Sequence, residues 1–357
     1  MSNTKFLNMK FRKSDDEKLN IGHKVKLSKI FTDSRKLAKK NECIYCGKEV
    51  TSFCNSHSIP AFCLRNISKN GELFYSNVFI NMPLLPLDKG VNNAGTFQIL
   101  CHECDSNVFQ EYENPNNYEK NPTPKMVAQI AMKNYLRAIS KRLNEHALFD
   151  ITKKEFPDTT DILNYMQEIQ KMDLKEYKAG YEKAKRISVK NWPEAYHVFC
   201  YERLNYVVPM AFQGMVALLS DLDGQIINDL YYENPKYIIE EIHICVFPLN
   251  DSSIVMMFVD SRFKRYRKFY KKFCVLPLDE KLALISYIIL LYSEDVFFSK
   301  EIPDDILHDE NIKDVCGQTT SVLSKDFVDV IERAKDVFDL SKCNTIPNLL
   351  SEKYKLR

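Results

Sequence analysis

The sequence predicts an α+β fold, with an N-terminal module held together by two pairs of cysteines, central helices, and a C-terminal α+β domain with a small antiparallel sheet. Three observations predict this architecture. Two Cys-x-x-Cys pairs stand at residues 43–46 and 101–104. A helical pattern of apolar residues begins after Thr123 and Pro124. Residues 241–247 alternate with a period of two, as a half-buried strand does.

The composition is that of a globular chain. Its 357 residues exceed one average domain, so we expect about two or three domains. Apolar residues make up 45% and the net charge is +2, so any affinity for nucleic acid has to come from local basic patches. The N-terminus lacks the apolar core of a secretory signal, and the longest apolar stretch, Leu282 to Tyr292, is too short to cross a bilayer. We therefore expect a cytoplasmic protein without a membrane partner.

Four segments follow one another along the chain. Residues 1–40 hold twelve Lys or Arg against four Asp or Glu, which predicts a basic N-terminal arm, with a solvated tail as the alternative. Residues 41–122 form the cysteine-bearing module, and loop-forming Gly, Pro and Asn residues lie between its two cysteine pairs. Residues 123–190 form a helical segment, and residues 191–357 form the α+β domain.

The central segment predicts three helices. Thr123 is a typical N-cap and Pro124 a typical first helical residue, so a helix should run from there to about residue 149. Two further helical patterns cover residues 160–171 and 174–187.

The C-terminal segment predicts strands first and helices afterwards. Apolar and aromatic runs at 196–210 and 214–220 are typical of strands. Residues 241–247 and 253–259 are separated by turn residues and should form a hairpin. Asp279 is expected to cap a helix over 280–292, and Ser324 a last helix that ends near 339.

The cysteines indicate a metal site. The chain has eleven cysteines, an odd number, and no export signal, so disulfides do not explain them. The two-residue spacer lets a tight turn aim two thiolates at one ion, and Gly47 supplies the flexibility that such a turn needs. Two pairs complete a tetrahedral site for structural Zn²⁺. Redox-active thiols or unrelated core cysteines are the alternatives. The four predicted ligands are Cys43, Cys46, Cys101 and Cys104.

The residues between and around the cysteine pairs carry a family resemblance. Residues 56–60 read Ser-His-Ser-Ile-Pro, and residues 97–105 read Phe-Gln-Ile-Leu-Cys-His-Glu-Cys-Asp. This resembles the zinc-bearing form of the HNH endonucleases, also called ββα-metal or His-Me finger nucleases, over roughly residues 41–113. In that family a strand ending in Asp-His-Ile-x-Pro follows the first pair, and the second pair enters a helix. The resemblance implies a ββα-metal module that hydrolyses DNA rather than RNA.

The resemblance also implies roles for five residues. His57 stands at the position of the general base, and histidine titrates near neutral pH, which suits that role. Asp105 stands at the position of the last metal ligand and would hold a catalytic Mg²⁺ or Mn²⁺. Ser56 replaces a metal-binding Asp of the family, and Thr96 replaces an Asn that braces the loop. Glu111 would reach the ion only through a bound water.

These departures leave other functions open. His57 can be a structural histidine and Asp105 a helix cap, in which case the chain is a non-catalytic zinc-stabilised protein that binds nucleic acid or a partner. A thiol redox enzyme is a third reading, and it requires an exposed Cys-x-x-Cys pair without zinc. A small HNH-like module joined to a larger domain also resembles anti-phage defence nucleases. The C-terminal domain would then recognise substrate, a protein partner or an activating ligand, and cleavage of both strands would favour a homodimer.

A second basic feature covers residues 262–273, with seven cations, five aromatic residues and no acid. On a helix, the aromatic side chains fall on one stripe, which predicts a core-facing helix with a solvated basic face. The functional alternative is that this face contacts nucleic-acid phosphates. The cations are Arg262, Lys264, Arg265, Arg267, Lys268, Lys271 and Lys272.

Overall fold

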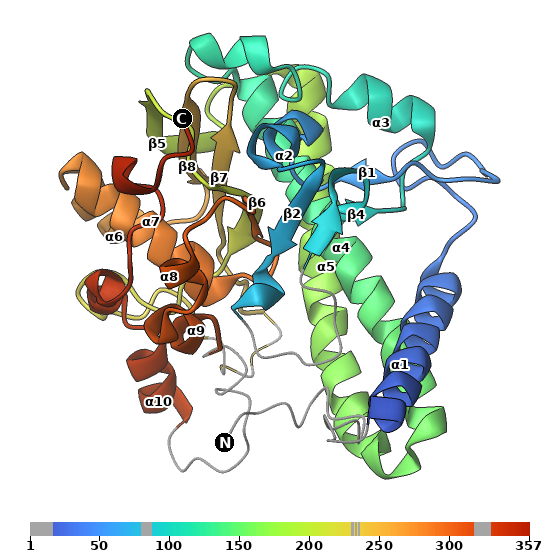
Figure 1. The fold of residues 1–357 in the computed structure, drawn as a ribbon. Coiled ribbons are helices and arrows are strands. Elements are labelled where there is room, and N and C mark those ends of the chain that lie inside the picture. The colour runs from blue at the N-terminus through green and yellow to red at the C-terminus, as the bar shows by residue number, and fades with distance from the viewer. Residues whose placement is uncertain (1–16, 80–87, 230–231, 233, 235, 318–329) are drawn as a thin grey trace.

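A sheet of seven strands forms the centre of the protein (Figure 1). The computed structural model describes residues 17–79, 88–229, 232, 234, 236–317 and 330–357. Neighbouring strands of the large sheet pair antiparallel in the order β3-β2-β9-β6-β7-β8-β5. The strands are β2 (Glu72–Tyr75), β3 (Asp88–Gly90), β5 (Tyr196–Leu204), β6 (Met210–Val216), β7 (Ile242–Pro248), β8 (Ser253–Asp260) and β9 (Phe297–Phe298). The predicted α+β class is confirmed.

The predicted hairpin over 241–259 is confirmed as β7 and β8, whose register runs from Ile242 opposite Val259 to Pro248 opposite Ser253. Two details differ from the prediction. Every residue of both strands is buried, because helices cover both faces of the sheet here. The sheet is also larger than expected, since β2 and β3 of the cysteine-bearing module and the short β9 extend it.

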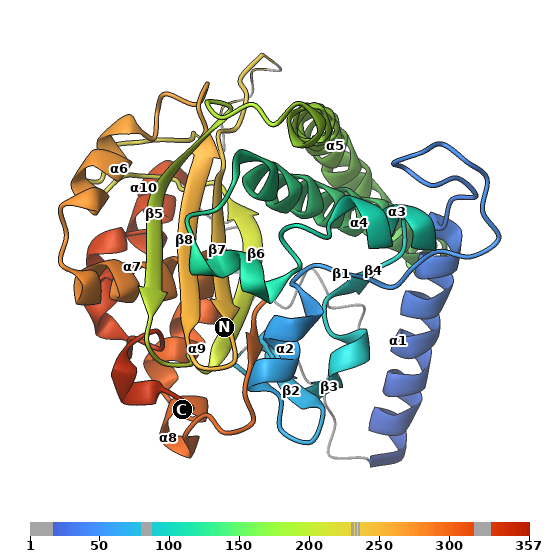
Figure 2. The ribbon, with the colours of Figure 1, turned by 90° about the horizontal axis from the view of Figure 1, so that it is seen from above.

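Helices lie on both faces of the sheet (Figure 2). One face carries α6 (Arg267–Cys274), α7 (Leu278–Tyr292), α9 (Glu310–Gly317) and α10 (Val330–Val337). The other face carries α4 (Pro124–Glu155) and α5 (Thr160–Lys190), which pack against each other as an antiparallel pair.

The predicted start of α4 is confirmed, because the Thr123 hydroxyl accepts a hydrogen bond from Met126 N at 3.1 Å. The helix continues to Glu155, beyond the predicted end near 149. The two helices expected over 160–171 and 174–187 are one continuous helix, α5, because no residue between them breaks a helix. All residues from Met126 to Leu136 of α4 are buried, including Lys133.

Part of the predicted basic arm is helical. Residues Glu17–Ala38 form α1, which packs against α4 and buries Ile30 and Ser34. The expectation of an arm is therefore wrong for these residues. The local charge pattern does not reveal that they contact α4. Residues 1–16 of the predicted arm lie outside the described residues.

The N-terminal module adds a second, two-stranded sheet. Strand β1 (Ser56–His57) pairs antiparallel with β4 (Thr96–Phe97), and α2 (Ala61–Ile67), β2 and β3 lie between them in the sequence. Helix α3 (His102–Val108) follows β4. One hydrophobic core joins this module to α4, α5 and the inner strands of the large sheet, with Leu100, Tyr118 and Phe247 among its members. The predicted module and the C-terminal half therefore share a sheet and a core.

The apolar stretch predicted as a core helix is α7, and its residues Leu282 to Leu291 are buried. It begins at Leu278 after Pro277, so Asp279 lies in the first turn and does not cap it. The short helix α8 (Asp304–Leu307) precedes α9. Ser324 lies outside the described residues, and α10 ends at Val337. In the part of the chain that the structure describes, no helix has both the length and the apolar character of a bilayer span.

Candidate metal centre and its surroundings

The four predicted zinc ligands lie together. The sulfur atoms of Cys43, Cys46, Cys101 and Cys104 are all within 4.8 Å of one another. A tetrahedral Zn²⁺ with bonds of about 2.3 Å would hold its sulfurs about 3.8 Å apart, so the cluster is close to that geometry. The first pair sits on a tight turn, in which Gly47 has a φ of +71° and donates its N–H to Cys43 O at 2.8 Å. The sequence-based prediction for this turn is confirmed.

The second pair is positioned by the start of α3. Cys101 is the N-cap of this helix, and its sulfur accepts a hydrogen bond from Cys104 N at 3.5 Å. Cys101 N in turn donates to Cys43 Sγ at 3.3 Å, and Ile44 N donates to Ile99 O at 3.1 Å. These hydrogen bonds connect the two cysteine-bearing turns directly to each other.

The electrostatics of the cluster fit a metal ion. Burial raises the pKa of Cys43, but backbone N–H groups of Cys101, Cys46 and Tyr45 outweigh burial and lower the pKa to about 7. Burial and the neighbouring thiols raise the pKa of Cys104. Four thiolates so close together repel one another unless a cation binds them, and a donor set of four sulfurs is typical of structural Zn²⁺.

Helix α5 supports the first cysteine pair from outside, which sequence reasoning missed. Tyr181 OH donates to Ile44 O at 3.3 Å, and Lys185 Nζ donates to Tyr45 O at 2.6 Å. The Lys185 ammonium also lies 4.3 Å from the centre of the Tyr45 ring. The turn that carries Cys43 and Cys46 is thus anchored to α5.

His57 lies on β1 opposite Thr96 and is half-buried. Its Nε2 atom is 3.1 Å from the carbonyl oxygen of Val91. A carbonyl only accepts hydrogen bonds, so Nε2 carries the proton and Nδ1 is the basic nitrogen. The backbone bonding between the two segments continues beyond β1, because Ser58 N donates to Gly95 O at 3.0 Å, and Gly95 has a φ of +65°.

Asp105 lies on α3 and is engaged through both carboxylate oxygens. Lys133 Nζ is 2.9 Å from Oδ1, and the Cys54 thiol donates to Oδ2 at 3.2 Å. Burial raises the pKa of Asp105, but Lys133 first, then Ser56 and Cys54, outweigh it and lower the pKa. The buried Ser56 hydroxyl is close enough to contribute, although it lacks the geometry of a hydrogen bond.

Lys133 is the main residue that the sequence analysis missed. Its side chain is fully buried, and its Nζ lies 3.1 Å from Glu113 Oε1 as well as beside Asp105. The ammonium also lies 3.9 Å from the centre of the Phe109 ring. The only signal in the sequence is a lysine within the buried run Met126–Leu136 of α4. A buried lysine needs anionic partners, but the sequence does not show which ones.

The other two predicted site residues serve the local structure. Thr96 Oγ1 donates to Asn93 O at 3.4 Å, which helps to close the loop before β4. Glu111 accepts a hydrogen bond from the Thr123 hydroxyl and pairs with Lys125 at 3.1 Å, so it supports the start of α4. The acid that lies near Asp105 is Glu113, through their shared partner Lys133.

The aromatic residues of the basic stretch 262–273 pack into the core as predicted, whereas the helix, α6, begins only at Arg267. Tyr266, Phe269 and Phe273 are fully buried in the core under α6. Several cations of the opposite face are paired with acids of neighbouring loops. The pairs are Arg262 with Asp260, Arg265 with Glu240, Lys268 with Asp221 and Asp223, and Lys272 with Asp223. A contact of this face with nucleic acid stays a prediction.

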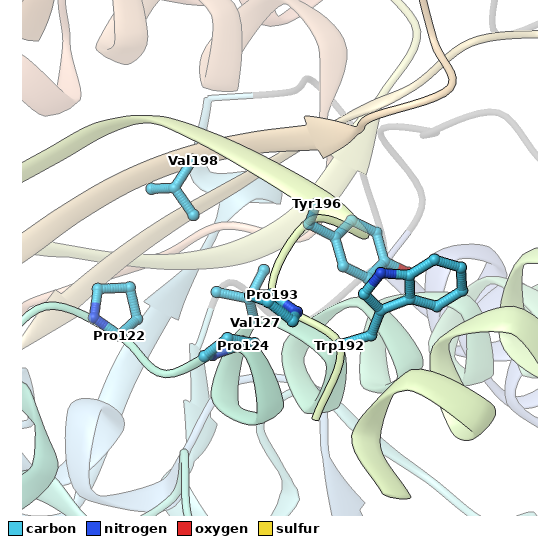
Figure 3. Close-up of a pocket in the computed structure, with 7 residues that line it drawn as sticks. All are labelled: Pro122, Pro124, Val127, Trp192, Pro193, Tyr196 and Val198. Atoms are coloured by element: carbon cyan, nitrogen blue, oxygen red, sulfur yellow. The ribbon is translucent and has the colours of Figure 1, made fainter. Parts of the chain in front are cut away.

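A small hollow lies between the start of α4, the loop after α5 and β5 (Figure 3). Pro122, Pro124, Trp192 and Pro193 line it, and its volume is about 70 Å³. This is well below the size of a typical small-molecule site, which is at least about 300 Å³. None of its lining residues belongs to the cysteine cluster or to the surroundings of His57.

Comparisons with known proteins do not identify the chain. No protein-family model matches the sequence, and no curated protein or solved structure matches it. Among the described residues, the tetracysteine cluster is the one group of three or more potential ligands at metal-binding distances. The DNA substrate, the protein partner or activating ligand, the homodimer and the defence role therefore rest on the resemblance in residues 41–113 alone.

Proposed function

We propose that the protein is an HNH-like endonuclease that hydrolyses phosphodiester bonds of DNA, with His57 as the general base. The order of elements supports this proposal. Strands β1 and β4 pair antiparallel and α3 follows β4, with α2, β2 and β3 between the two strands in the chain. The first cysteine pair precedes β1 and the second stands at the start of α3, in the order that the resemblance implies. The observation that carries the proposal is the contact between His57 Nε2 and Val91 O, which fixes the ring and leaves Nδ1 as a base.

The chemistry follows from this orientation. Nδ1 of His57 takes a proton from a water molecule, whose oxygen attacks the phosphorus atom. A new P–O bond forms while the bond between phosphorus and the sugar oxygen breaks, and that oxygen leaves with a proton from solvent. A zinc ion on the four cysteines would hold the first cysteine turn and the start of α3 together and would take no part in these steps.

The side chains beside Asp105 do not fit the catalytic Mg²⁺ or Mn²⁺ that the sequence predicts. Both oxygens of Asp105 are engaged, Ser56 brings no charge, and the Lys133 ammonium lies between Asp105 and Glu113. A divalent ion at this place would have to displace a buried lysine. We therefore derive no step through such an ion.

The same cluster favours a second candidate, a non-catalytic zinc-stabilised protein that binds nucleic acid or a partner. Lys133 neutralises the acids that a metal-dependent nuclease would need, so the cluster can serve to join α3 to α4. In this case His57 is a structural residue that fixes the loop at Val91.

A plasmid-cleavage assay separates the two functions. The purified protein is incubated with supercoiled plasmid with Mg²⁺, with Mn²⁺ and without an added divalent ion. The endonuclease predicts nicking by the wild type, its loss in His57→Ala, and its retention in His102→Ala, an exposed histidine of the same module. Zinc content is measured in all three proteins. Equal nicking by His57→Ala, or no nicking by a zinc-loaded wild type that still binds DNA, would support the binding protein instead.

A further inference from the structure

Residues 25–40, the last part of α1 and the two residues after it, are strongly basic. They contain six Lys or Arg and one acid, Asp33, whereas the whole chain has a net charge of only +2. The six cations are Lys26, Lys29, Arg35, Lys36, Lys39 and Lys40. This stretch is therefore the kind of local basic patch on which an affinity for nucleic acid depends.

Most of these cations have no acidic partner. Lys26 pairs with Glu155 of α4 at 3.3 Å, and Lys36 lies 3.9 Å from Asp33. The four cations that are exposed and form no ion pair with a described residue are Lys29, Arg35, Lys39 and Lys40. The positive charge of this stretch is thus largely uncompensated, unlike that of α6, whose lysines share the carboxylate of Asp223.

Lys29 and Lys36 lie on the face of α1 that is turned away from the protein. Residues seven positions apart share a helix face, so the two lysines lie in one row, about 10.5 Å apart along the axis. Ile30 and Ser34, which are buried where α1 packs on α4, point about 130° away from this row. The Lys36 side chain is accordingly 76% exposed. Both views of the ribbon show α1 at the margin of the molecule, away from the large sheet (Figure 1 and Figure 2).

The end of α1 is attached to the cysteine-bearing module. The Lys39 ammonium lies 5.8 Å from the centre of the ring of Phe53, a buried residue of this module. Asn41 O then accepts a hydrogen bond from Val50 N at 2.8 Å, beside the turn of the first cysteine pair. These contacts give the basic face a fixed place next to the module to which the proposed function assigns cleavage.

We propose that the outward face of α1 binds backbone phosphates of a DNA duplex, with Lys29 and Lys36 at its centre and Arg35, Lys39 and Lys40 beside them. Exposed Lys and Arg side chains without acidic partners can neutralise phosphates at no cost from broken ion pairs. Such contacts hold and orient the duplex without reading its sequence. The choice of ligand rests on the proposed function, but the binding test does not require cleavage.

The distribution of apolar residues favours DNA over an anionic membrane surface. A helix that binds in a membrane interface has one continuous apolar face, separate from its basic face. On α1 the buried Ile30 faces α4 and is covered. The exposed apolar residues lie on both sides of the lysine row and form no continuous face of their own. They are Ile21, Val25 and Leu37.

The plain alternative is a solvated basic face that has no ligand. The two cases differ in the salt dependence of DNA binding. A lysine that contacts a phosphate releases about one counterion, so the loss of two such lysines weakens binding of every sequence and lowers the salt slope by about 2. Lysines that only face solvent affect binding no more than any other pair of exposed lysines.

The test is fluorescence anisotropy of a labelled DNA duplex over a series of NaCl concentrations, with no divalent ion added. The double variant Lys29→Met and Lys36→Met should weaken binding and lower the slope by about 2, and Lys29→Arg with Lys36→Arg should retain both quantities. Methionine forms helices about as well as lysine, so α1 is preserved. The control, Lys175→Met with Lys178→Met, removes the same charge from exposed positions of α5 and should match the wild type.

A second double variant, Lys39→Met with Lys40→Met, lies after the end of α1 and does not depend on the helix. Wild-type affinity and slope in both double variants, an equal loss in the α5 control, or no DNA binding by the wild type would each overturn the α1 site, even if the plasmid assay shows nicking. A lower slope in a protein that does not cleave would support the site and leave only the nuclease proposal refuted.

A separate arm uses vesicles of phosphatidylcholine and phosphatidylserine. The wild type should not sediment with these vesicles. Co-sedimentation that is lost in Lys29→Met with Lys36→Met, together with unchanged DNA binding of that variant, would assign the face to a membrane surface and overturn the nucleic-acid ligand.

Discussion

Lys133 and Asp105 form an ion pair between α4 and α3, with Lys133 Nζ 2.9 Å from Asp105 Oδ1. Glu113 adds a second carboxylate at 3.1 Å from the same ammonium. The pair thereby links α3, which begins at the second cysteine pair, to α4, which packs on the large sheet. The Lys133 ammonium thus lies beside Asp105, where the sequence predicts a divalent ion.

We predict that Lys133→Met destabilises the protein by about 3–5 kcal/mol, because it leaves the largely buried carboxylate of Asp105 and the half-buried one of Glu113 without their partner. The free energy of unfolding is measured by denaturant titration at pH 7. Lys48→Met is the control, since Lys48 and its partner Glu103 are exposed and such a pair contributes about 0–1 kcal/mol.

A double variant sharpens this prediction. Lys133→Met combined with Asp105→Asn should lose less stability than the sum of the two single variants, because each single variant breaks the same interaction. Additive losses would mean that Lys133 and Asp105 do not interact as the structure shows.

Removal of zinc should destabilise the whole chain and not the N-terminal module alone. The cysteine cluster shares a hydrophobic core with α4, α5, β7 and β8, so loosening of the module exposes that core. We expect about one zinc ion per purified chain, its loss in Cys104→Ser, and a lower melting temperature after chelation. Cys54→Ser, in the same module, should keep its zinc. A zinc-free wild type with an unchanged melting temperature would contradict this prediction and reopen the reading as a redox thiol enzyme.

His243 should contribute stability that is lost in acid. This residue is fully buried on β7, stacks on Phe258 with 4.6 Å between the ring centres, and lies 3.0 Å from Asn134 Nδ2 through its Nδ1. Burial is the main cause that lowers its pKa to about 3. The folded pKa lies below the unfolded value of about 6.5, so the unfolded state binds the proton first as the pH falls. The loss of stability therefore begins near pH 6.5 and continues towards pH 3.

The measurement is denaturant unfolding of the wild type and His243→Gln at pH 7 and pH 5. The wild type should lose about 1–2 kcal/mol between these values from this group. His243→Gln should lose less over the same interval, even if it is less stable at pH 7. An equal loss in both proteins would assign the acid sensitivity to other groups.

The local features of the fold could be predicted from the sequence, whereas the contacts between distant segments could not. The turn at Gly47, the N-cap Thr123 and the β7–β8 hairpin depend on residues within a few positions of one another, and all three are confirmed. The pairing of Phe74 in β2 with Phe298 in β9 joins segments more than two hundred residues apart. Nothing in the local pattern of either strand specifies that partner.

The same limit applies to the candidate site. The four cysteines could be assigned to one site because the two-residue spacer within each Cys-x-x-Cys pair is typical of zinc ligands. Lys133 could not be assigned to Asp105, because the two residues are 28 positions apart and meet only when α4 packs on α3. The acid near Asp105 was therefore expected at Glu111, but it is Glu113 that reaches the shared lysine.

The ion pairs on the basic stretch 262–273 lead to a last prediction. Asp223 binds both Lys268 and Lys272, so these two ammonium groups already have a carboxylate partner. A phosphate would have to compete with that carboxylate, which reduces the gain from binding. We expect the double variant Lys268→Met and Lys272→Met to bind DNA within about twofold of the wild type and with the same salt slope. Asp223→Asn, which frees Lys272 and leaves Lys268 with Asp221 alone, should raise the affinity and the slope. A loss of affinity in the double variant well beyond twofold, with a lower salt slope, would show instead that the α6 face contacts the phosphates directly, as the sequence pattern alone suggests.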